Sequence, residues 1–302
     1  MELLNTIINI FQIFRTNRYS NGLVCAHCHS QEVIRYGTYN SKQRYKCNTC
    51  KRTFGDFTNS PLNMCHFPDK WPKFIECIIK GLSLRESAVL VGVSYITLFY
   101  WRHKLLIALK SIENAKFIGL VEVADIFLPY SLKGPNAIEY RPARKSGRKF
   151  EYLHGEKVCV ITAIDESKNI AARATLNFGF NKKCVEGALG KLVTEENTML
   201  FLQKPPYSAF CNDRKIKFFN RKTDEPNINS GRVYLCDYLS WMLRFKGIAS
   251  KYTNSYLSWY KFISGINFDE TVIGIKKLIT AMSFQYIHQI NASIGRQRLA
   301  TA

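Results

Sequence analysis

Four cysteines near the N-terminus constrain the fold of this chain more than any other feature. Residues 25–50 read CAHCHSQEVIRYGTYNSKQRYKCNTC, so Cys25 and Cys28 form one C-x-x-C turn and Cys47 and Cys50 form another. Each turn can direct two thiolates at one ion, and four thiolates complete a tetrahedral structural zinc site. The intervening runs EVIRYG and QRYKC predict a hairpin around the polar turn TYNSK. A module this small has little core, so bound zinc would supply free energy for its folding.

Two alternatives for these positions stay open. His27 and His29 lie beside the first pair and could substitute for a cysteine ligand, and the cysteines could instead form disulfides. The remaining cysteines are scattered, which favours free thiols in a reducing compartment. These six are Cys65, Cys77, Cys159, Cys184, Cys211 and Cys236.

Basic and aromatic residues interleave through the predicted ribbon. Cations suit contact with phosphates, and aromatic rings suit stacking on bases, although zinc ribbons also serve as protein-contact modules. The candidate DNA contacts of the ribbon are Arg35, Lys42, Arg44 and Lys46.

The charge of the whole chain points in the same direction. Its 302 residues contain 43 Lys and Arg against 23 Asp and Glu, which gives a net charge of +20. So basic a chain suits a polyanionic partner, above all nucleic acid. The hydrophobic content of 46% is enough for a packed core, and no apolar run approaches the roughly 20 residues that span a bilayer. We therefore expect no membrane association, and residues 1–20 suggest an amphipathic helix rather than a signal peptide.

Residues 71–107 predict a helix-turn-helix. Apolar residues recur at helical spacing from Trp71 to Ile79. Ser83 and Glu86 have the spacing of a capping box, and Gly92 is a typical helix stop. Ser94 can cap a second helix, YITLFYWRHKLL. A tight turn between two such helices is typical of DNA-binding domains, but also of ordinary helical hairpins.

In such a domain the second helix lies in the major groove. Its first residues would face base edges, and later cations would lie nearer the DNA backbone. The predicted base contacts are Tyr95, Thr97 and Leu98, and the predicted backbone contacts are Arg102, His103 and Lys104.

From residue 117 to about 280 the pattern changes to that of an α/β domain. Strand-like runs occupy 117–128, 157–167, 169–180 and 198–203, with a helical run at 181–197. We interpret 204–231 as a loop that contains one strand-like piece, KIKFF, and the residues beyond it as mostly helical. This order predicts a mixed sheet with flanking helices, the layout of an RNase H-like domain. The basic loop between the first two strands adds three candidate DNA contacts, Arg144, Lys145 and Arg148.

Taken together, these modules resemble the zinc-ribbon insertion-sequence transposases related to the Merlin group. The resemblance covers roughly residues 20–265 and is carried by YKCNTCKRTFGDFTNSPL, VEVADIFLPYSLKG and WMLRFKGIASKYTNSYLSWYKF. It implies a multidomain α/β chain: an N-terminal helix at 1–20, a zinc ribbon at 21–60, a helix-turn-helix at 66–112, an RNase H-like domain at 117–265 and a helical tail at 266–302. It also implies double-stranded DNA as partner, a homodimer or larger assembly, and a cytoplasmic, nucleoid-associated or nuclear location.

Such enzymes hold two divalent metals, usually Mg²⁺, on three acidic or amide residues. In the family's first catalytic strand, Glu122 matches a glutamate, but the expected aspartate falls on Ala124 and Asp125 follows one place late. The second expected position falls on or near Gln203, and no carboxylate stands between Glu196 and Asp213. The third falls on or near Arg232, and an arginine does not ligate a metal. All three expected ligand positions are thus substituted.

Three hypotheses follow from these substitutions. The first is a transposase-derived protein that binds DNA without cutting it. The second is an active Mg²⁺-dependent transposase with an unorthodox site, built from Glu122 or Asp125 together with Asp165, Asp213 and Asp237. The third is a ribbon-based module that contacts protein or RNA. For Asp165, which ends a strand, the simpler interpretation is a turn-forming aspartate.

Overall fold

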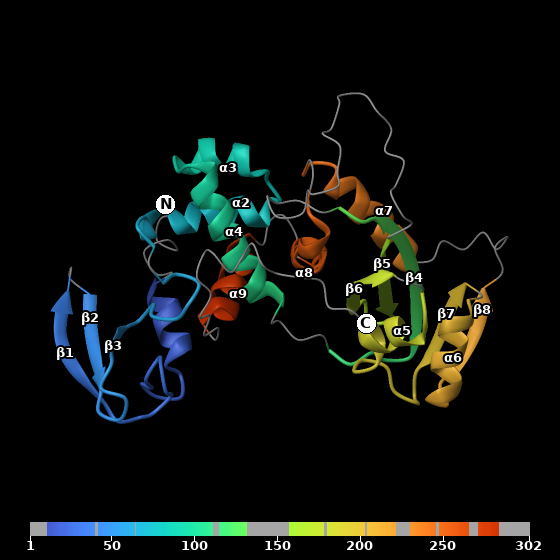
Figure 1. Ribbon diagram of the computed structural model, residues 1–302, viewed down its shortest axis with the longest axis horizontal. Helices are drawn as coiled ribbons and strands as arrows, with labels where there is room; N and C mark the ends of the chain where they lie inside the picture. The colour runs from blue at the N-terminus through green and yellow to red at the C-terminus, as the bar shows by residue number, and fades with distance from the viewer. Residues whose placement is uncertain are drawn as a thin grey trace, which may run out of the picture. The chain divides into compact units, whose positions relative to one another are not determined.

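The computed structural model describes residues 11–39, 42–63, 65–110, 115–131, 157–177, 180–202, 204–221, 230–245, 248–265 and 271–283. These residues fall into two compact units (Figure 1). The first draws on residues 1–112 and 262–294, and the second on 113–261 and 295–302.

The zinc ribbon of the first unit is a three-stranded antiparallel sheet. Its strands are β1 (Val33–Tyr39), β2 (Lys42–Cys47) and β3 (Thr53–Gly55), so the predicted hairpin is confirmed and gains a third strand. Tyr45 and Phe54 pair across β2 and β3, and both are buried with Cys25, Ala26 and Cys47. This core is small, as expected for a fold that depends on a metal.

The helix at residues 11–18 packs onto the ribbon. Phe14 is fully buried, and its ring lies 5.3 Å from that of Phe57 in an edge-on contact. Arg18 donates hydrogen bonds to the carbonyl oxygens of Asp56 and Thr58, at 3.0 and 2.5 Å. The helix is therefore an integral part of the ribbon module, and not a separate segment before it.

Three helices follow the ribbon: α2 (Trp71–Ile79), α3 (Leu84–Val91) and α4 (Tyr95–Lys110). Ser83 and Glu86 form the predicted capping box at the start of α3, which is thereby confirmed. Gly92 ends that helix with a φ of 64°, a left-handed conformation that glycine adopts at little cost. Trp71 and Trp101 stack at 4.7 Å between α2 and α4.

The helix α9 (Thr271–Ser283) belongs to this first unit, although it lies far along the chain. It contacts α2 and α4, and Ile275, Leu278 and Ile279 are buried. The prediction of a C-terminal tail over 266–302 is therefore corrected for these residues. An apolar stripe on a helix needs a partner surface, and α2 and α4 provide it.

The second unit contains a mixed five-stranded sheet in the order β6-β5-β4-β7-β8. Its strands are β4 (Leu120–Pro129), β5 (Lys157–Asp165), β6 (Ile170–Asn177), β7 (Thr198–Leu202) and β8 (Lys217–Arg221). The first three pair antiparallel, whereas β7 runs parallel to both β4 and β8. The predicted mixed sheet is confirmed.

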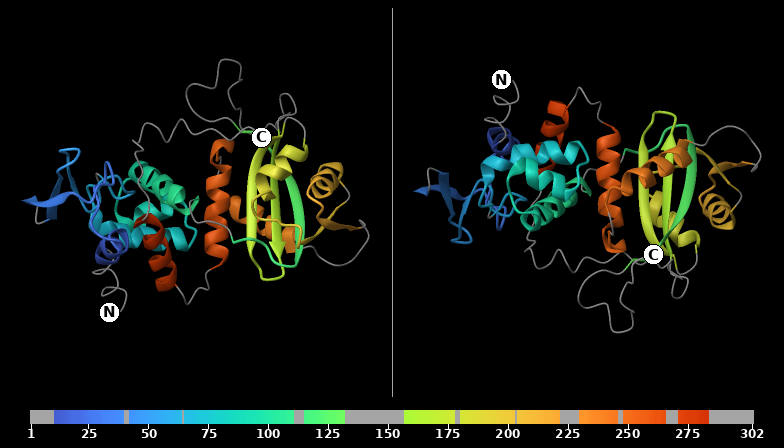
Figure 2. Two further views of the ribbon diagram at one scale, coloured as in Figure 1. Left: turned by 90° about the horizontal axis from the view of Figure 1, so that it is seen from below. Right: turned by 90° about the horizontal axis from the view of Figure 1, so that it is seen from above.

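Helices cover both faces of this sheet (Figure 2). One face carries α5 (Lys182–Leu189) and α6 (Pro205–Asp213), and the other carries α7 (Ser230–Met242), which contacts β4 and β5. The prediction that residues 204–231 form a loop was wrong for α6. Pro205 and Pro206 occupy the first helical turn, where a missing N–H is tolerated, so this proline pair starts a helix.

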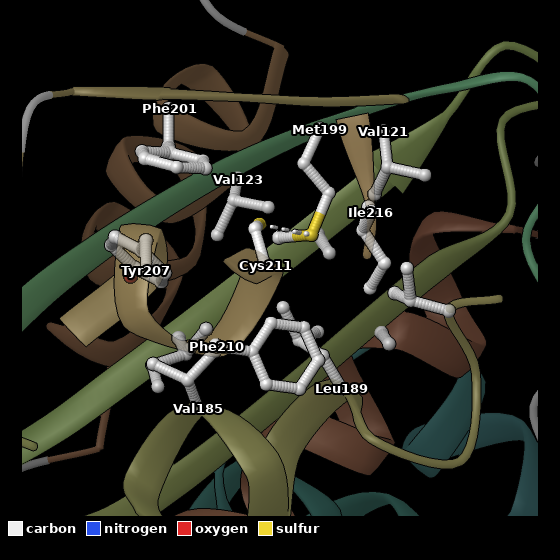
Figure 3. Packing of buried hydrophobic residues seen from close by; sticks show 14 of the residues in the cluster. Val121, Val123, Val185, Leu189, Met199, Phe201, Tyr207, Phe210, Cys211 and Ile216 are labelled. Carbon is white, nitrogen blue, oxygen red and sulfur yellow. Dashed lines mark hydrogen bonds between the residues drawn. The ribbon is translucent and has the colours of Figure 1, made fainter. Parts of the chain in front are cut away.

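The core beneath α5 and α6 is apolar and continuous (Figure 3). Val121 and Val123 of β4 point into it, as do Val185 and Leu189 of α5. Cys211 of α6 lies 3.5 Å from Met199 of β7, sulfur to sulfur. Because side chains alternate along a strand, the residues of β4 between these valines face α7.

A cluster of aromatic rings joins α7 to α8 (Thr253–Ser264). Trp241 lies 4.9 Å from Trp259, and its ring also contacts Phe245, Tyr256 and Tyr260. These residues come from the segment WMLRFKGIASKYTNSYLSWYKF, whose aromatic pattern is thus a packing requirement.

Candidate functional site

The four cysteines of the ribbon form a compact tetrad. Their sulfur atoms all lie within 4.8 Å of one another, with Cys25 and Cys50 at 3.7 Å and Cys28 and Cys47 at 3.6 Å. Four sulfurs at about 2.3 Å from a central zinc ion would lie roughly 3.8 Å apart at tetrahedral angles. A disulfide requires about 2.05 Å, so this spacing suits a zinc ion and excludes a disulfide. The predicted metal ligands are therefore brought together.

Backbone amides support this tetrad. The His27 amide donates to the sulfur of Cys25 at 3.4 Å, and the Cys50 amide donates to the sulfur of Cys47 at 3.5 Å. The hydrogen bond from Cys50 lowers the pKa of Cys47 to about 6, in spite of the opposing effect of burial, whereas burial raises the pKa of Cys25. The lowered pKa of Cys47 favours its thiolate, which is the form that binds zinc.

The histidines and the other cysteines take no part in this group. The ring of His27 contacts the carbonyl oxygen of Thr53 at 3.4 Å. All ten cysteines are free of disulfides, and most of the six outside the ribbon are buried or half-buried. The alternative of histidine ligands is thus unnecessary, because four sulfurs already complete the site.

The outer face of the ribbon is basic and aromatic. The Tyr36 ring on β1 is 48% exposed, and both Arg44 and Lys46 of β2 approach it, with their charged groups 5.7 and 5.3 Å from its centre. Arg35 and Lys42 are exposed as well. The four basic residues predicted for DNA contact therefore remain accessible, and two of them flank a stacking surface.

On α4 the predicted contacts divide into two groups. Tyr95 is exposed and Thr97 is half-buried at the start of the helix, and their contact with DNA stays a prediction. Leu98, Arg102 and His103 are 0%, 2% and 1% exposed, and their predicted contact with DNA was therefore wrong.

Helical periodicity explains this result. Leu98 and Arg102 are one turn apart and share the face that packs against the bundle. The guanidinium of Arg102 donates to the carbonyl oxygen of Leu82 at 3.0 Å. Lys104 donates to the carbonyl oxygen of Asn63 at 3.1 Å, and burial lowers its pKa. These cations therefore support the fold instead of facing outward.

A further lysine, Lys70, lies beside the turn between α3 and α4, and no sequence pattern predicted it there. Lys70 ends the short helix η1 (Pro68–Lys70), and its ammonium donates to the carbonyl oxygen of Gly92 at 2.8 Å. It thus places a positive charge in the turn between α3 and α4. Lys70 and Gly92 are 22 positions apart in the sequence and meet only in the tertiary fold. The one local signal was the helix stop at Gly92, because carbonyl groups at a helix end have no partner within the helix.

The α7 face of β4 is where the resemblance places a metal site. Glu122 and Ala124 share this face, and the Glu122 carboxylate accepts a hydrogen bond of 2.7 Å from the amide of Ser230, the first residue of α7. Arg232 lies within the first turn of the same helix and is exposed. The structure therefore brings the strand of Ala124 next to the helix of Arg232, while Glu122 caps that helix.

The strand β7, which pairs with β4, is the third element of this region. Glu122 pairs with Leu200 in parallel, so two residues further on Leu202 is level with Ala124. Gln203, the residue after Leu202, lies outside the described residues, as do Arg144, Lys145 and Arg148.

Asp125 points to the opposite face of the sheet, as strand alternation predicts. Its carboxylate is 5% exposed and accepts hydrogen bonds from Lys204 at 2.5 Å and from the Tyr207 hydroxyl at 3.0 Å. The Lys204 ammonium also lies 5.4 Å from the centre of the Phe127 ring and 5.6 Å from that of Phe180. Asp125 is therefore occupied by an internal ion pair.

The other three acids are separated from one another. The Asp165 carboxylate accepts hydrogen bonds from the amides of Ile118 and Asn169, at 3.0 and 2.8 Å, which supports its interpretation as a turn former. Burial raises its pKa, but these hydrogen bonds outweigh that effect and the pKa is lowered. Asp213 pairs with Lys182, and Asp237 lies on the exposed side of α7.

Within the described residues, the cysteine tetrad is the one group of three or more cysteines, histidines and acids that is close enough to hold a metal ion. The acids proposed for an unorthodox Mg²⁺ site do not assemble there. No helix in the described ranges has both the length and the apolar character needed to cross a membrane.

The ribbon matches a known family. Residues 9–53 match the family described as "Transposase zinc-ribbon domain", a range that includes the helix at 11–18 as well as the cysteines. The "Uncharacterized protein in transposable element ISH50" of Halobacterium salinarum is 32% identical over 132 residues. That match covers 43% of this chain and spans 44% of the relative's own length. The N-terminal region is therefore similar to the zinc-ribbon domain of transposases.

Two solved structures show a weak likeness to the chain. "Crystal structure of a pre-cleavage Mos1 transpososome" has a TM-score of 0.31 at 12% identity, covering 73% of this chain and 78% of that one. "Crystal structure of the Mos1 Strand Transfer Complex" has a TM-score of 0.33 at 14% identity, covering 68% and 73%.

Proposed function

We propose that this protein is a transposase-derived DNA-binding protein of the Merlin-related group, whose RNase H-like domain no longer holds a catalytic metal pair. The strand order β6-β5-β4-β7-β8, with three antiparallel strands followed by two parallel ones, supports the RNase H-like assignment. The ribbon family and the relative from a transposable element support the origin.

One observation supports the proposed loss of DNA cleavage activity. On the α7 face of β4, the single carboxylate is that of Glu122, and it accepts a hydrogen bond from the first amide of α7. The neighbouring position on that face is Ala124, and Arg232 is exposed in the first turn of α7, a turn with no acidic residue. A two-metal site needs several anionic oxygen ligands, and this face of β4 offers one carboxylate.

DNA binding is supported by the accessible basic residues and by the net charge of +20. Arg44 and Lys46 flank Tyr36 on the ribbon, where cations can contact phosphates while the ring stacks. The helices α3 and α4 join through the tight turn at Gly92, in keeping with a helix-turn-helix. Lys70 and Tyr95 place a cation and an exposed ring beside that turn.

A cleavage assay tests the catalytic part of the proposal. The full chain is incubated with supercoiled DNA and with transposon-end duplexes, in Mg²⁺ and in Mn²⁺. We expect binding without strand cleavage. Metal-dependent cleavage that disappears in Asp125→Ala or Asp165→Ala would instead establish the active enzyme with an unorthodox site.

Duplex affinity measured over a range of salt concentrations tests the DNA-binding part. Each lost phosphate contact should reduce the slope of log K against log salt by about 0.9. We expect such a reduction for Arg44→Ala and Lys46→Ala. Lys191→Ala, an exposed lysine in a turn of the sheet unit, is the matched control and should leave the slope unchanged. If no variant of the ribbon or of the α3–α4 turn changes duplex binding, the ribbon is a module for other partners.

A further inference from the structure

The first turn of α4 presents apolar side chains to the outside. Tyr95 is 58% exposed and Ile96 is 54% exposed, although both belong to residue types that are usually buried or half-buried. Leu98, two residues later, is fully buried, so the helix has one face in the bundle and another facing outward. Ile96 was not among the residues that the sequence suggested for DNA contact.

The chemistry of this turn restricts what it could recognise. In the major groove, guanine is read by Arg or Lys and adenine by Asn or Gln, whereas thymine offers its C5-methyl group to apolar side chains. Residues 93–100 read VSYITLFY and contain none of these four polar types. The first cation beyond them, Arg102, is buried and donates to Leu82.

We propose that Ile96 and the ring of Tyr95 contact thymine methyl groups in the major groove, so that the protein selects DNA sites by the position of thymines. This inference rests on the proposed function, because it assumes that α4 enters the groove. The hydroxyl groups of Tyr95 and Thr97 remain as the polar groups of this turn, and a hydroxyl accepts or donates to several base edges with little discrimination.

The position of Lys70 favours DNA as the occupant of this surface over an apolar protein partner. Its ammonium lies 2.8 Å from the carbonyl oxygen of Gly92. Gly92 comes two residues before Ser94, the residue that directly precedes α4. An ammonium has three donors, so others remain for a phosphate. The N-terminal end of a helix also favours phosphate groups. A cation that lies beside an apolar surface suits DNA, where the cation can contact a backbone phosphate and the apolar surface a base edge.

The test compares thymine with deoxyuridine, which lacks the C5-methyl group and is otherwise the same. A preferred duplex is first selected from a randomised library with the full chain. Each of its thymines is then replaced singly, and affinity is measured by fluorescence anisotropy at fixed salt. We expect at least one replacement to weaken binding about fourfold, the effect of one buried methyl group.

Two variants test which side chain causes the difference in affinity between thymine and deoxyuridine duplexes. Ile96→Ala should bind the thymine duplex more weakly than the wild type and should bind thymine and deoxyuridine duplexes equally. Val89→Ala is the matched control, because Val89 is 84% exposed on α3 and lies outside the proposed contact. It should keep the wild-type ratio of affinities. Zinc content and far-UV circular dichroism verify that each variant is folded.

Each other outcome overturns the inference in a recognisable way. If the wild type binds deoxyuridine duplexes as tightly at every position, while Lys70→Ala still weakens binding, thymine readout is wrong and DNA binding stands. If no duplex is selected, the proposed function fails together with the inference. If Ile96→Ala changes the sedimentation coefficient and not the ratio of affinities, this face is a contact between two copies of the chain.

Discussion

Asp125 stands one residue past the expected ligand position, and Lys204 and Tyr207 hold its carboxylate on the far face of the sheet. We expect Lys204→Ala to lower the free energy of unfolding, because it leaves a buried carboxylate without its countercharge. Loss of one partner from a fully buried pair costs roughly 3–5 kcal/mol. Lys204 is 32% exposed, so we expect a smaller loss, about 2 kcal/mol, in urea denaturation.

Two further variants separate charge from packing at this pair. Lys204→Met retains an apolar stem beside Phe127 and Phe180 but removes the charge, so it should still destabilise. The double variant Asp125→Ala with Lys204→Ala should be more stable than the sum of its two single variants predicts. Additive single effects would show that the ion pair contributes nothing to stability.

At the scale of elements, two glycines give opposite predictions for the same substitution. Gly92 ends α3 with a φ of 64°, whereas Gly187 lies within α5 and has open space around its α-carbon. Gly92→Ala forces an alanine into the left-handed region and should destabilise by about 1 kcal/mol. Gly187→Ala should stabilise by about 0.5–1 kcal/mol, since alanine favours a helix. Thermal unfolding of the two variants should shift Tm in opposite directions, and equal shifts would contradict the assigned backbone conformations.

Local signals in the sequence predicted most of these elements. The capping box at Ser83, the stop at Gly92 and the cysteine spacing are short-range features whose chemistry acts within a few residues. The predictions that were wrong concern residues whose orientation depends on tertiary packing. Whether Arg102 faces DNA or the bundle is decided by which stripe of α4 meets α2 and α9, and α9 comes from the other end of the chain.

The candidate site shows the same division. Strand alternation was sufficient to place Glu122 and Asp125 on opposite faces of the sheet. The hydrogen bond from Ser230 to Glu122 joins residues 108 positions apart, and no pattern in the sequence indicates it. The helix α6 was missed because its two prolines suggested a loop, although they occupy the one turn of a helix where proline is tolerated.

For the whole molecule, the ribbon and the sheet unit are expected to depend on different sources of stability. The sheet unit buries a large apolar cluster between β4, β7, α5 and α6. The ribbon buries five residues in its core, two of which are cysteines of the tetrad. A module with so little apolar burial relies on its metal, whereas the sheet unit does not.

Removal of zinc should therefore unfold only part of the chain. We expect a chelator to abolish the hydrogen-exchange protection of residues 33–55, while residues 157–165 of the buried strand β5 remain protected. Cys47→Ser should have the same effect without a chelator, because a tetrahedral site lacks one of its four thiolates. Addition of zinc should restore protection in the chelated wild type but not in the variant. Protection of residues 33–55 in a chain shown to contain no zinc would mean that the ribbon core is stable without its metal.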